Sequence, residues 1–176
     1  MDEQAQGAKE LFALYYGSLL HMHREGKSEE YRSYNISKEI EIEWFQEMIE
    51  KHSKDLSIRN WDAVASLSSI AKNYQDSSMV EKVASFAARN IMSADSIVKL
   101  MFAEGMVEII RSNKKVLSKE LLFKACKGTV EILEGIISLP LVIDPGHELE
   151  QFHIKDKRSL NSRAKQGVQA VMDILN

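Results

Sequence analysis

Cysteine and proline are both scarce in this chain of 176 residues. The single cysteine, Cys126, has no partner within the chain, which excludes a small secreted fold held together by internal disulfides. The only two prolines, Pro140 and Pro145, both lie in the segment SLPLVIDPGHELEQFH, residues 138–153. That segment also holds two of the five histidines, which makes it the first place to look for a reactive loop.

A long apolar run is also missing. The longest such run, GIISLPLVI, is broken by Pro140 and is much shorter than the roughly 20 residues of a membrane-spanning helix. The first residues, MDEQAQGAKE, are acidic where a secretory signal peptide is basic and then apolar. We therefore expect a soluble, cytoplasmic protein that has no membrane partner.

The composition excludes a disordered chain as well. Apolar residues make up 44% of the sequence and charged residues 28%, which is ordinary for a globular protein. The length favours one domain, since a chain of this size can bury roughly 70% of the surface that it exposes when unfolded.

What the chain does contain is amphipathic helix from end to end. Apolar residues recur at steps of three and four in almost every segment, and β-branched runs bounded by tight turns are absent. The pattern predicts a single all-α domain of six to eight helices, arranged as a globular bundle or as a short right-handed helical array. Its predicted parts are acidic N-terminal helices over 1–54, a helical core over 57–139, a loop over 140–155 and a C-terminal helix over 156–175.

Two helices are predicted in the N-terminal part. One apolar stripe runs from Ala8 to His23 at helical spacing, and Gly26 is a plausible stop. The next segment, EIEIEW, alternates like a strand at its start, but the helical spacing that follows favours a helix over 37–54 with Ser37 as its cap.

Serine and aspartate mark the later helix starts. Ser93 is expected to begin a helix in the middle of the chain, and Ser118 begins the most regular helix of the sequence. Either Asp156 or Ser159 is expected to cap the last helix.

Two segments of the core start with an aspartate 33 residues apart, Asp62 and Asp95, and each reads as helix, break, helix. Within residues 94–137, a small residue and Gly105 precede a helix of the type Val107–Ile110, and a long apolar helix follows. This arrangement resembles an armadillo or HEAT repeat. The resemblance implies the array version of the fold, in which helical hairpins stack side by side.

The formal net charge of −3 is unevenly spread. Residues 1–50 contain eleven acids and five bases, whereas bases dominate residues 111–127 and 155–165. No helix-turn-helix spacing or basic–aromatic interleaving accompanies these bases, so the pattern disfavours nucleic acid as a partner. It favours an acidic protein surface or self-association with the acidic N-terminal part of a second copy. The candidate interaction bases are Lys114, Lys115, Lys119, Arg158 and Arg163.

Catalytic motifs are absent from the sequence. It contains no Walker loop, no Gly-x-Gly-x-x-Gly and no Gly-x-Ser-x-Gly. Cys126 falls on an apolar helical stripe, as a buried structural thiol does. Nothing in the sequence therefore supports an enzyme or a bound cofactor.

Possible metal ligands occur in the loop that follows the helical core. Glu150 and His153 form a Glu-x-x-His pair, which His147 and Asp144 could join. A second Glu-x-x-His is absent, and Pro140 followed by the turn DPGH is typical of a connector between helices. We expect a surface connector without metal whose histidines face solvent. The alternative is a metal-dependent enzyme that uses His147, Glu150 and His153.

Small residues recur along the most regular helix. Leu121, Gly128 and Gly135 are seven residues apart and share one line of this helix. Glycine inside a helix costs roughly 1 kcal/mol relative to alanine, so the spacing indicates close approach by another group. We expect Gly128 and Gly135 to be packed in the core, and a dimer seam is the alternative.

Taken together, these features favour a non-enzymatic protein–protein interaction module, such as an adaptor or an immunity-type protein. The alternative is a helical small-ligand-binding or regulatory protein. Its pocket is expected to be lined by Phe86, Met101, Phe102 and Phe123.

Overall fold

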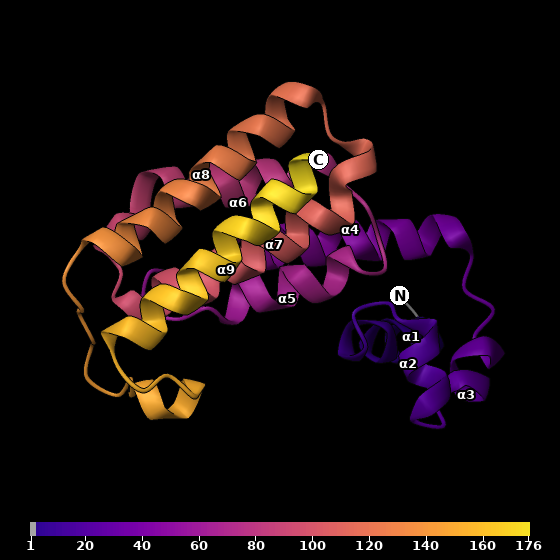
Figure 1. Ribbon diagram of the computed structural model, residues 1–176. Helices are drawn as coiled ribbons and strands as arrows, with labels where there is room; N and C mark the ends of the chain where they lie inside the picture. The colour runs from indigo at the N-terminus through magenta and orange to yellow at the C-terminus, as the bar shows by residue number, and fades with distance from the viewer. Residues whose placement is uncertain (1–2) are drawn as a thin grey trace.

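The computed structural model describes residues 3–176, and these form nine α-helices, three short 3-10 helices and no β-strand (Figure 1). The all-α fold predicted from the sequence is confirmed. The α-helices are α1 (Glu3–Leu14), α2 (Leu19–Arg24), α3 (Ser28–Ser33), α4 (Lys38–Lys54), α5 (Asp62–Ala71), α6 (Ser77–Asn90), α7 (Ser96–Asn113), α8 (Lys119–Ser138) and α9 (Lys157–Leu175). The 3-10 helices are η1 (Ile91–Ser93), η2 (Lys114–Val116) and η3 (Leu149–Phe152).

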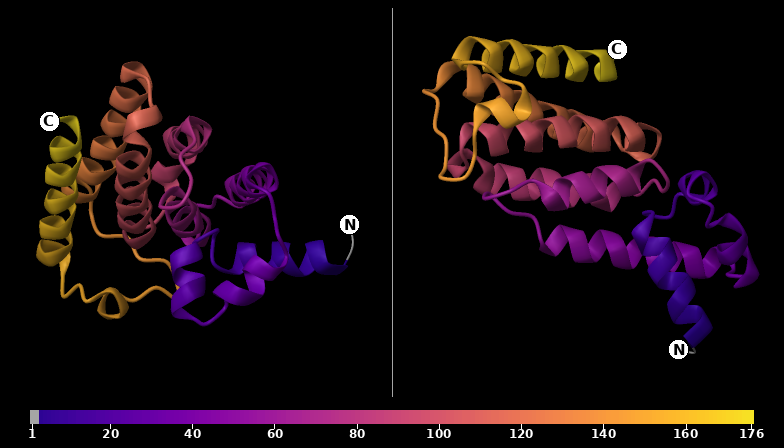
Figure 2. Two further views of the ribbon diagram at one scale, coloured as in Figure 1. Left: turned by 90° about the vertical axis from the view of Figure 1, so that its right-hand side faces the viewer. Right: turned by 90° about the horizontal axis from the view of Figure 1, so that it is seen from below.

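The helices from α4 to α9 lie in two rows. One row contains α4, α6 and α8, and the other contains α5, α7 and α9, with contacts both along and between the rows (Figure 2). The two sequence segments that start at Asp62 and Asp95 become α5–α6 and α7–α8, which occupy successive positions in these rows. Their relation to armadillo or HEAT repeats stays a prediction.

The core is centred on α7, which contacts α5, α6, α8 and α9. Twelve of its 18 residues are buried, including Leu100 and Phe102. A helix that is apolar around most of its circumference must be enclosed on all sides, and α7 is enclosed in this way. None of the helices in residues 3–176 combines the length and apolar composition that a membrane crossing requires.

The N-terminal helices α1, α2 and α3 lie at the end of the molecule opposite α9 (Figure 2). The ring of Phe12 on α1 lies 4.8 Å from that of Phe45 and 5.4 Å from that of Trp44, both on α4. Offset and edge-on aromatic pairs of this kind stabilise beyond the area that they bury. They hold the N-terminal helices against α4.

A glycine turn divides the first predicted helix in two. Tyr16 and Gly17 both have positive φ, 51° and 75°, and they separate α1 from α2. A Cβ atom on Gly17 would lie 2.3 Å from the ring of Phe45, so the residue needs both the conformational freedom and the small size of glycine. The prediction of one continuous stripe from Ala8 to His23 is wrong here because it counted the apolar spacing and overlooked this turn.

Most of the predicted helix caps are present. The side chains of Ser37, Ser118 and Asp156 each accept a backbone N–H from the first turn of α4, α8 and α9. The start predicted at Ser93 is wrong, because Ser93 ends η1 and the cap of α7 is Asp95.

Candidate functional site

Three exposed apolar side chains of the second half of the molecule lie together on the face formed by α8 and α9. Phe123, in the second turn of α8, is 63% exposed. Met172 and Leu175, in the last turns of α9, are 43% and 41% exposed. Apolar side chains left open together on one face, as opposed to singly, mark a surface that a partner covers.

These side chains border a groove between the two helices. The groove has a volume of about 320 Å³. Its lining comes from one face of α8 and the last turns of α9: Phe123, Cys126, Lys127, Val130, Glu131, Glu134, Val171, Met172 and Leu175. The end of α9 lies beside the start of α8, where Lys114 Nζ donates to the carbonyl of Ile174. The two helices are therefore antiparallel neighbours with an open apolar channel between them.

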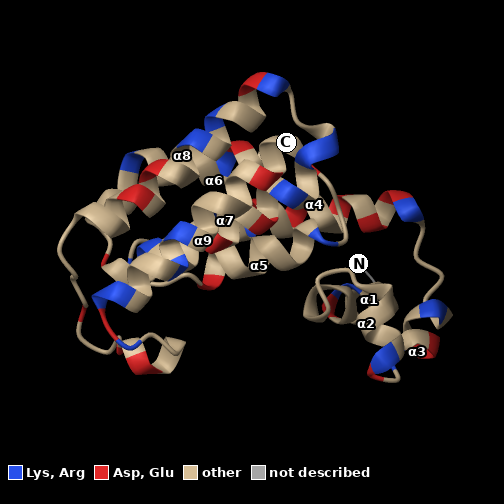
Figure 3. Ribbon diagram, viewed as in Figure 1, with Lys and Arg blue, Asp and Glu red and all other residues tan. Residues whose placement is uncertain are grey.

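Charge changes sign along the exposed face of α8 (Figure 3). Lys124 and Lys127 are exposed in the first half of the helix, and Glu131 and Glu134 are exposed in the second half. None of these four side chains forms an ion pair within the part of the chain that the structure describes. The groove is thus bordered by free bases at one end and free acids at the other.

The two glycines of α8 are not packed in the core as the sequence analysis predicted. A Cβ atom on Gly128 would have no neighbour within 4 Å, so this position is open. A Cβ atom on Gly135 would meet only the side-chain end of Met92, at 3.3 Å from its methyl carbon, and Met92 is itself exposed. Both glycines lie toward the surface of α8 because the buried face of this helix is formed by other residues: Ala125, Cys126, Thr129, Ile132, Leu133 and Ile136.

Two of the five candidate interaction bases are engaged within the molecule. Lys114 caps the last turn of α9 through the Ile174 carbonyl, where a cation is favoured by the helix dipole. Arg163 donates two bonds of 2.8 Å to the carboxylate of Glu104 on α7, and another of 3.1 Å to the carbonyl of Phe152. The Glu104 contact raises the pKa of Arg163. Lys115, Lys119 and Arg158 are exposed and remain candidates for contact with a partner.

The loop between α8 and α9 is held by the buried carboxylate of Asp95. Oδ1 accepts the N–H of Val98 at 2.8 Å, which caps α7. Oδ2 accepts the N–H of Asp144 at 2.9 Å and the Nδ1–H of His147 at 2.6 Å. Beside it, Ser96 and Val142 exchange two further hydrogen bonds. One helix start therefore fixes the loop at several points.

This network also sets the ionisation of Asp95, whose side chain has no exposed surface. Burial by itself raises the pKa of a carboxyl group, because it penalises the charged form. The N–H groups of Val98 and Asp144 and the imidazole of His147 outweigh that penalty and hold the pKa of Asp95 below its usual range. The charged form is accordingly part of the folded structure.

The loop is a connector, but only one of its histidines behaves as predicted. His153 is exposed, at a left-handed backbone position with φ of 58°. The side chain of His147 is only 18% exposed, bonded to Asp95 and 5.5 Å from the ring of Trp61. The expectation that both histidines face solvent is wrong for His147, because the turn DPGH folds it back onto the start of α7.

The structure changes the set of possible metal ligands. Asp95, Asp144 and His147 offer ligand atoms that lie within 4.8 Å of one another, whereas Glu150 and His153 are exposed and outside this group. Both carboxylate oxygens of Asp95 already accept hydrogen bonds from the protein itself. Asp95 and His147 are therefore bonded to each other and hold the loop, and Asp144 takes part through its backbone N–H.

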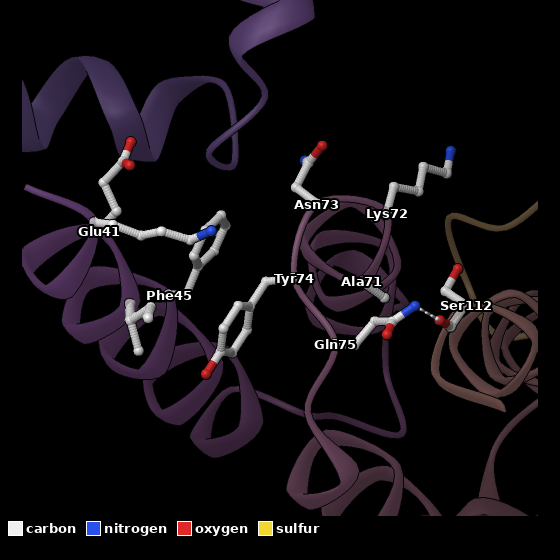
Figure 4. A pocket seen from close by; sticks show the side chains of 10 residues that line it. Glu41, Phe45, Ala71, Lys72, Asn73, Tyr74, Gln75 and Ser112 are labelled. Carbon is white, nitrogen blue, oxygen red and sulfur yellow. Dashed lines mark hydrogen bonds between the residues drawn. The ribbon is translucent and has the colours of Figure 1, made fainter. Parts of the chain in front are cut away.

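A second hollow lies where α4 meets the end of α5 (Figure 4). Its volume is about 700 Å³, and its floor is the stack of Phe45 on Tyr74, whose ring centroids are 4.8 Å apart. The polar groups around it bond within the protein, since Glu41 accepts the hydroxyl of Tyr31 and Gln75 donates to the carbonyl of Ser112. These contacts assign the hollow to the joint between the N-terminal helices and the two rows.

The four residues expected to line a ligand pocket do not lie together. Phe102 is completely buried in the core and stacks on Phe86, with ring centroids 5.8 Å apart. Phe123 lies instead on the outer face of α8, and Met101 is half-buried on α7. The pocket predicted from these residues is therefore not formed by them. Cys126 is buried, as predicted, and burial raises the pKa of its thiol.

Asp95 was not identified from the sequence as the residue that holds the loop between α8 and α9. Its signal was present, since an aspartate just before an apolar helix is a usual cap.

Comparison of the chain with protein-family models, with curated proteins and with solved structures finds no match.

Proposed function

We propose that this protein is a non-enzymatic protein-interaction module whose binding surface is the face formed by α8 and α9. The observation that carries the proposal is the open groove beside Phe123, an aromatic side chain that is mostly exposed on an otherwise well-packed helical fold. Aromatic side chains at the centre of an apolar surface are frequent anchors of protein interfaces.

The shape of the surface favours a helical partner. Two antiparallel neighbouring helices leave a channel between their ridges, and a third helix packs into such a channel with its apolar face. The lining of the groove spans about three turns of α8, from Phe123 to Glu134, which matches the length over which an amphipathic helix presents three or four anchors.

Charge at the two ends of the groove supports a fixed orientation for that partner. Lys124 and Lys127 attract acids, and Glu131 and Glu134 attract bases. Complementary charges at the border of an interface add to selectivity and to the rate of association more than to affinity. The apolar centre supplies most of the binding free energy.

A photo-crosslinking amino acid in place of Phe123 tests the proposal in cells that make the protein. It is expected to yield one covalent adduct of defined mass, containing a second polypeptide. The matched control carries the same crosslinker in place of Lys165, which is exposed on another part of α9. An adduct at both positions, or at neither, would contradict the proposal, and Val130→Asp should remove the adduct formed at position 123.

A further inference from the structure

Three apolar side chains of α8 form a seam at the edge of the groove. Phe123, Val130 and Ile137 are seven residues apart, so they fall on one line along the helix. Phe123 is exposed, and Val130 and Ile137 are half-buried. Apolar residues repeated every seven positions are the pattern by which two helices pack along their length.

The charges beside this seam reverse about its centre. Lys124 and Lys127 precede Val130, and Glu131 and Glu134 follow it. A second α8 running in the same direction would bring lysine near lysine and glutamate near glutamate. A second α8 running in the opposite direction brings each lysine pair near a glutamate pair.

From this self-complementarity we propose that the occupant of the groove is a second copy of the chain, joined through an antiparallel pair of α8 helices centred on Val130. The proposal rests on the proposed function and names its partner. Phe123 of each copy then lies opposite Ile137 of the other, because each is seven residues from the centre. The same residues serve both sides, as a closed two-fold interface requires.

The unpaired charges of α8 are compatible with this pairing. The four charged side chains are free of ion pairs within residues 3–176, so they do not need to break existing contacts. Gly128, two residues from the centre, lies on the opposite side of the helix and takes no part in the seam.

Charge reversal on α8 tests the antiparallel dimer by sedimentation equilibrium. The double substitution Lys124→Glu, Lys127→Glu makes all four of these side chains acidic, and Glu131→Lys, Glu134→Lys makes all four basic. Each variant alone is expected to dimerise at least roughly tenfold more weakly than the parent, because like charges then face each other across the two-fold. An equimolar mixture of the two is expected to recover the parent affinity as a dimer with one copy of each.

The matched control is Lys155→Glu, Lys165→Glu, which removes two exposed bases from outside α8. This variant should dimerise like the parent, and because its α8 is unchanged, mixing it with the basic α8 variant should not restore the parent affinity as the acidic variant does. A parent chain that stays monomeric at about 1 mM would overturn the second-copy proposal. So would oligomers that grow beyond the dimer, which would indicate a head-to-tail contact with the exposed Leu14, Leu19 and Leu20 of the N-terminal helices. A monomeric parent that still gives an adduct with a different protein at position 123 would leave the proposed function standing.

Discussion

The Nδ1 atom of His147 lies 2.6 Å from Oδ2 of Asp95, although the two residues are 52 positions apart in the chain. The same carboxylate caps α7 and accepts the N–H of Asp144. The start of the central helix and the long loop between α8 and α9 are therefore one structural unit. Since that loop leads into α9, the contact also helps to position α9, and with it the face formed by α8 and α9.

Replacing His147 with alanine is expected to destabilise the protein by roughly 1–2 kcal/mol, because a buried carboxylate loses a hydrogen-bond donor. His153→Ala is the matched control, since His153 is exposed in the same loop, and it should change the free energy of unfolding by at most about 0.5 kcal/mol. Urea denaturation followed by circular dichroism measures both. Equal effects of the two substitutions would show that the Asp95 contact does not stabilise the fold.

Acid should weaken the contacts between the Asp95 carboxylate and the loop. The pKa of Asp95 is lower in the folded than in the unfolded chain, where it is roughly 4. A depressed carboxyl pKa contributes stability above the unfolded pKa, and that contribution is lost as pH falls through the folded value. The difference in unfolding free energy between the parent and Asp95→Asn should therefore shrink from about pH 6 to about pH 3. A difference that is constant over this range would contradict the inference that the charged form of Asp95 stabilises the fold.

Position 17, in the turn between α1 and α2, should accept only glycine. Gly17→Ala is expected to cost about 3 kcal/mol or more, because it adds a clash with Phe45 to the strain of a left-handed backbone. Gly26→Ala has a similar φ of 74° but no neighbour within 4 Å, so it should cost only about 1–2 kcal/mol. Thermal unfolding compares the loss of stability in the two variants directly. Equal losses would show that the contact with Phe45 adds nothing to the backbone strain at position 17.

The ion pair between Arg163 and Glu104 should couple α9 to α7. A double-mutant cycle with Arg163→Met and Glu104→Gln is expected to give a coupling free energy of about 0.5–1 kcal/mol, since the contact is bidentate but partly exposed. The more exposed pair Lys54 and Glu50, at 3.5 Å, serves as the control and should give a smaller coupling free energy. A coupling for Arg163 no larger than the control would show that the pair contributes nothing beyond an ordinary surface contact.

Much of the fold could be predicted from the sequence because its signals are local. The spacing of apolar residues identified the helical class. The caps at Ser37 and Ser118, and Asp156 as one of two candidates for the last helix, could be predicted from single side chains. The turn at Gly17 was missed because its cause, the ring of Phe45, lies 28 residues away in the sequence. Local periodicity contains no information about such a neighbour.

The candidate site depended on packing that no single segment records. Gly128 and Gly135 were read as buried because glycines on one line suggest close contact, but spacing alone does not say which face of a helix is turned inward. Asp95 could have been recognised as a helix cap, but its second oxygen holds a loop that lies 49 to 52 residues further along the chain. Phe123 was expected to line a ligand pocket with Phe86 and Phe102, whereas its position on α8 places it on the outer face.

Disulfide trapping at the centre of α8 tests the central claim most directly. Val130→Cys places two thiols at the proposed two-fold axis, and Lys165→Cys places one on an exposed part of α9 as the control. The parent chain controls for Cys126, which is buried. Under mild oxidation, the account predicts that Val130→Cys forms a covalent dimer at least roughly tenfold faster than Lys165→Cys, because association holds the two positions together. Equal rates for the two variants would contradict it.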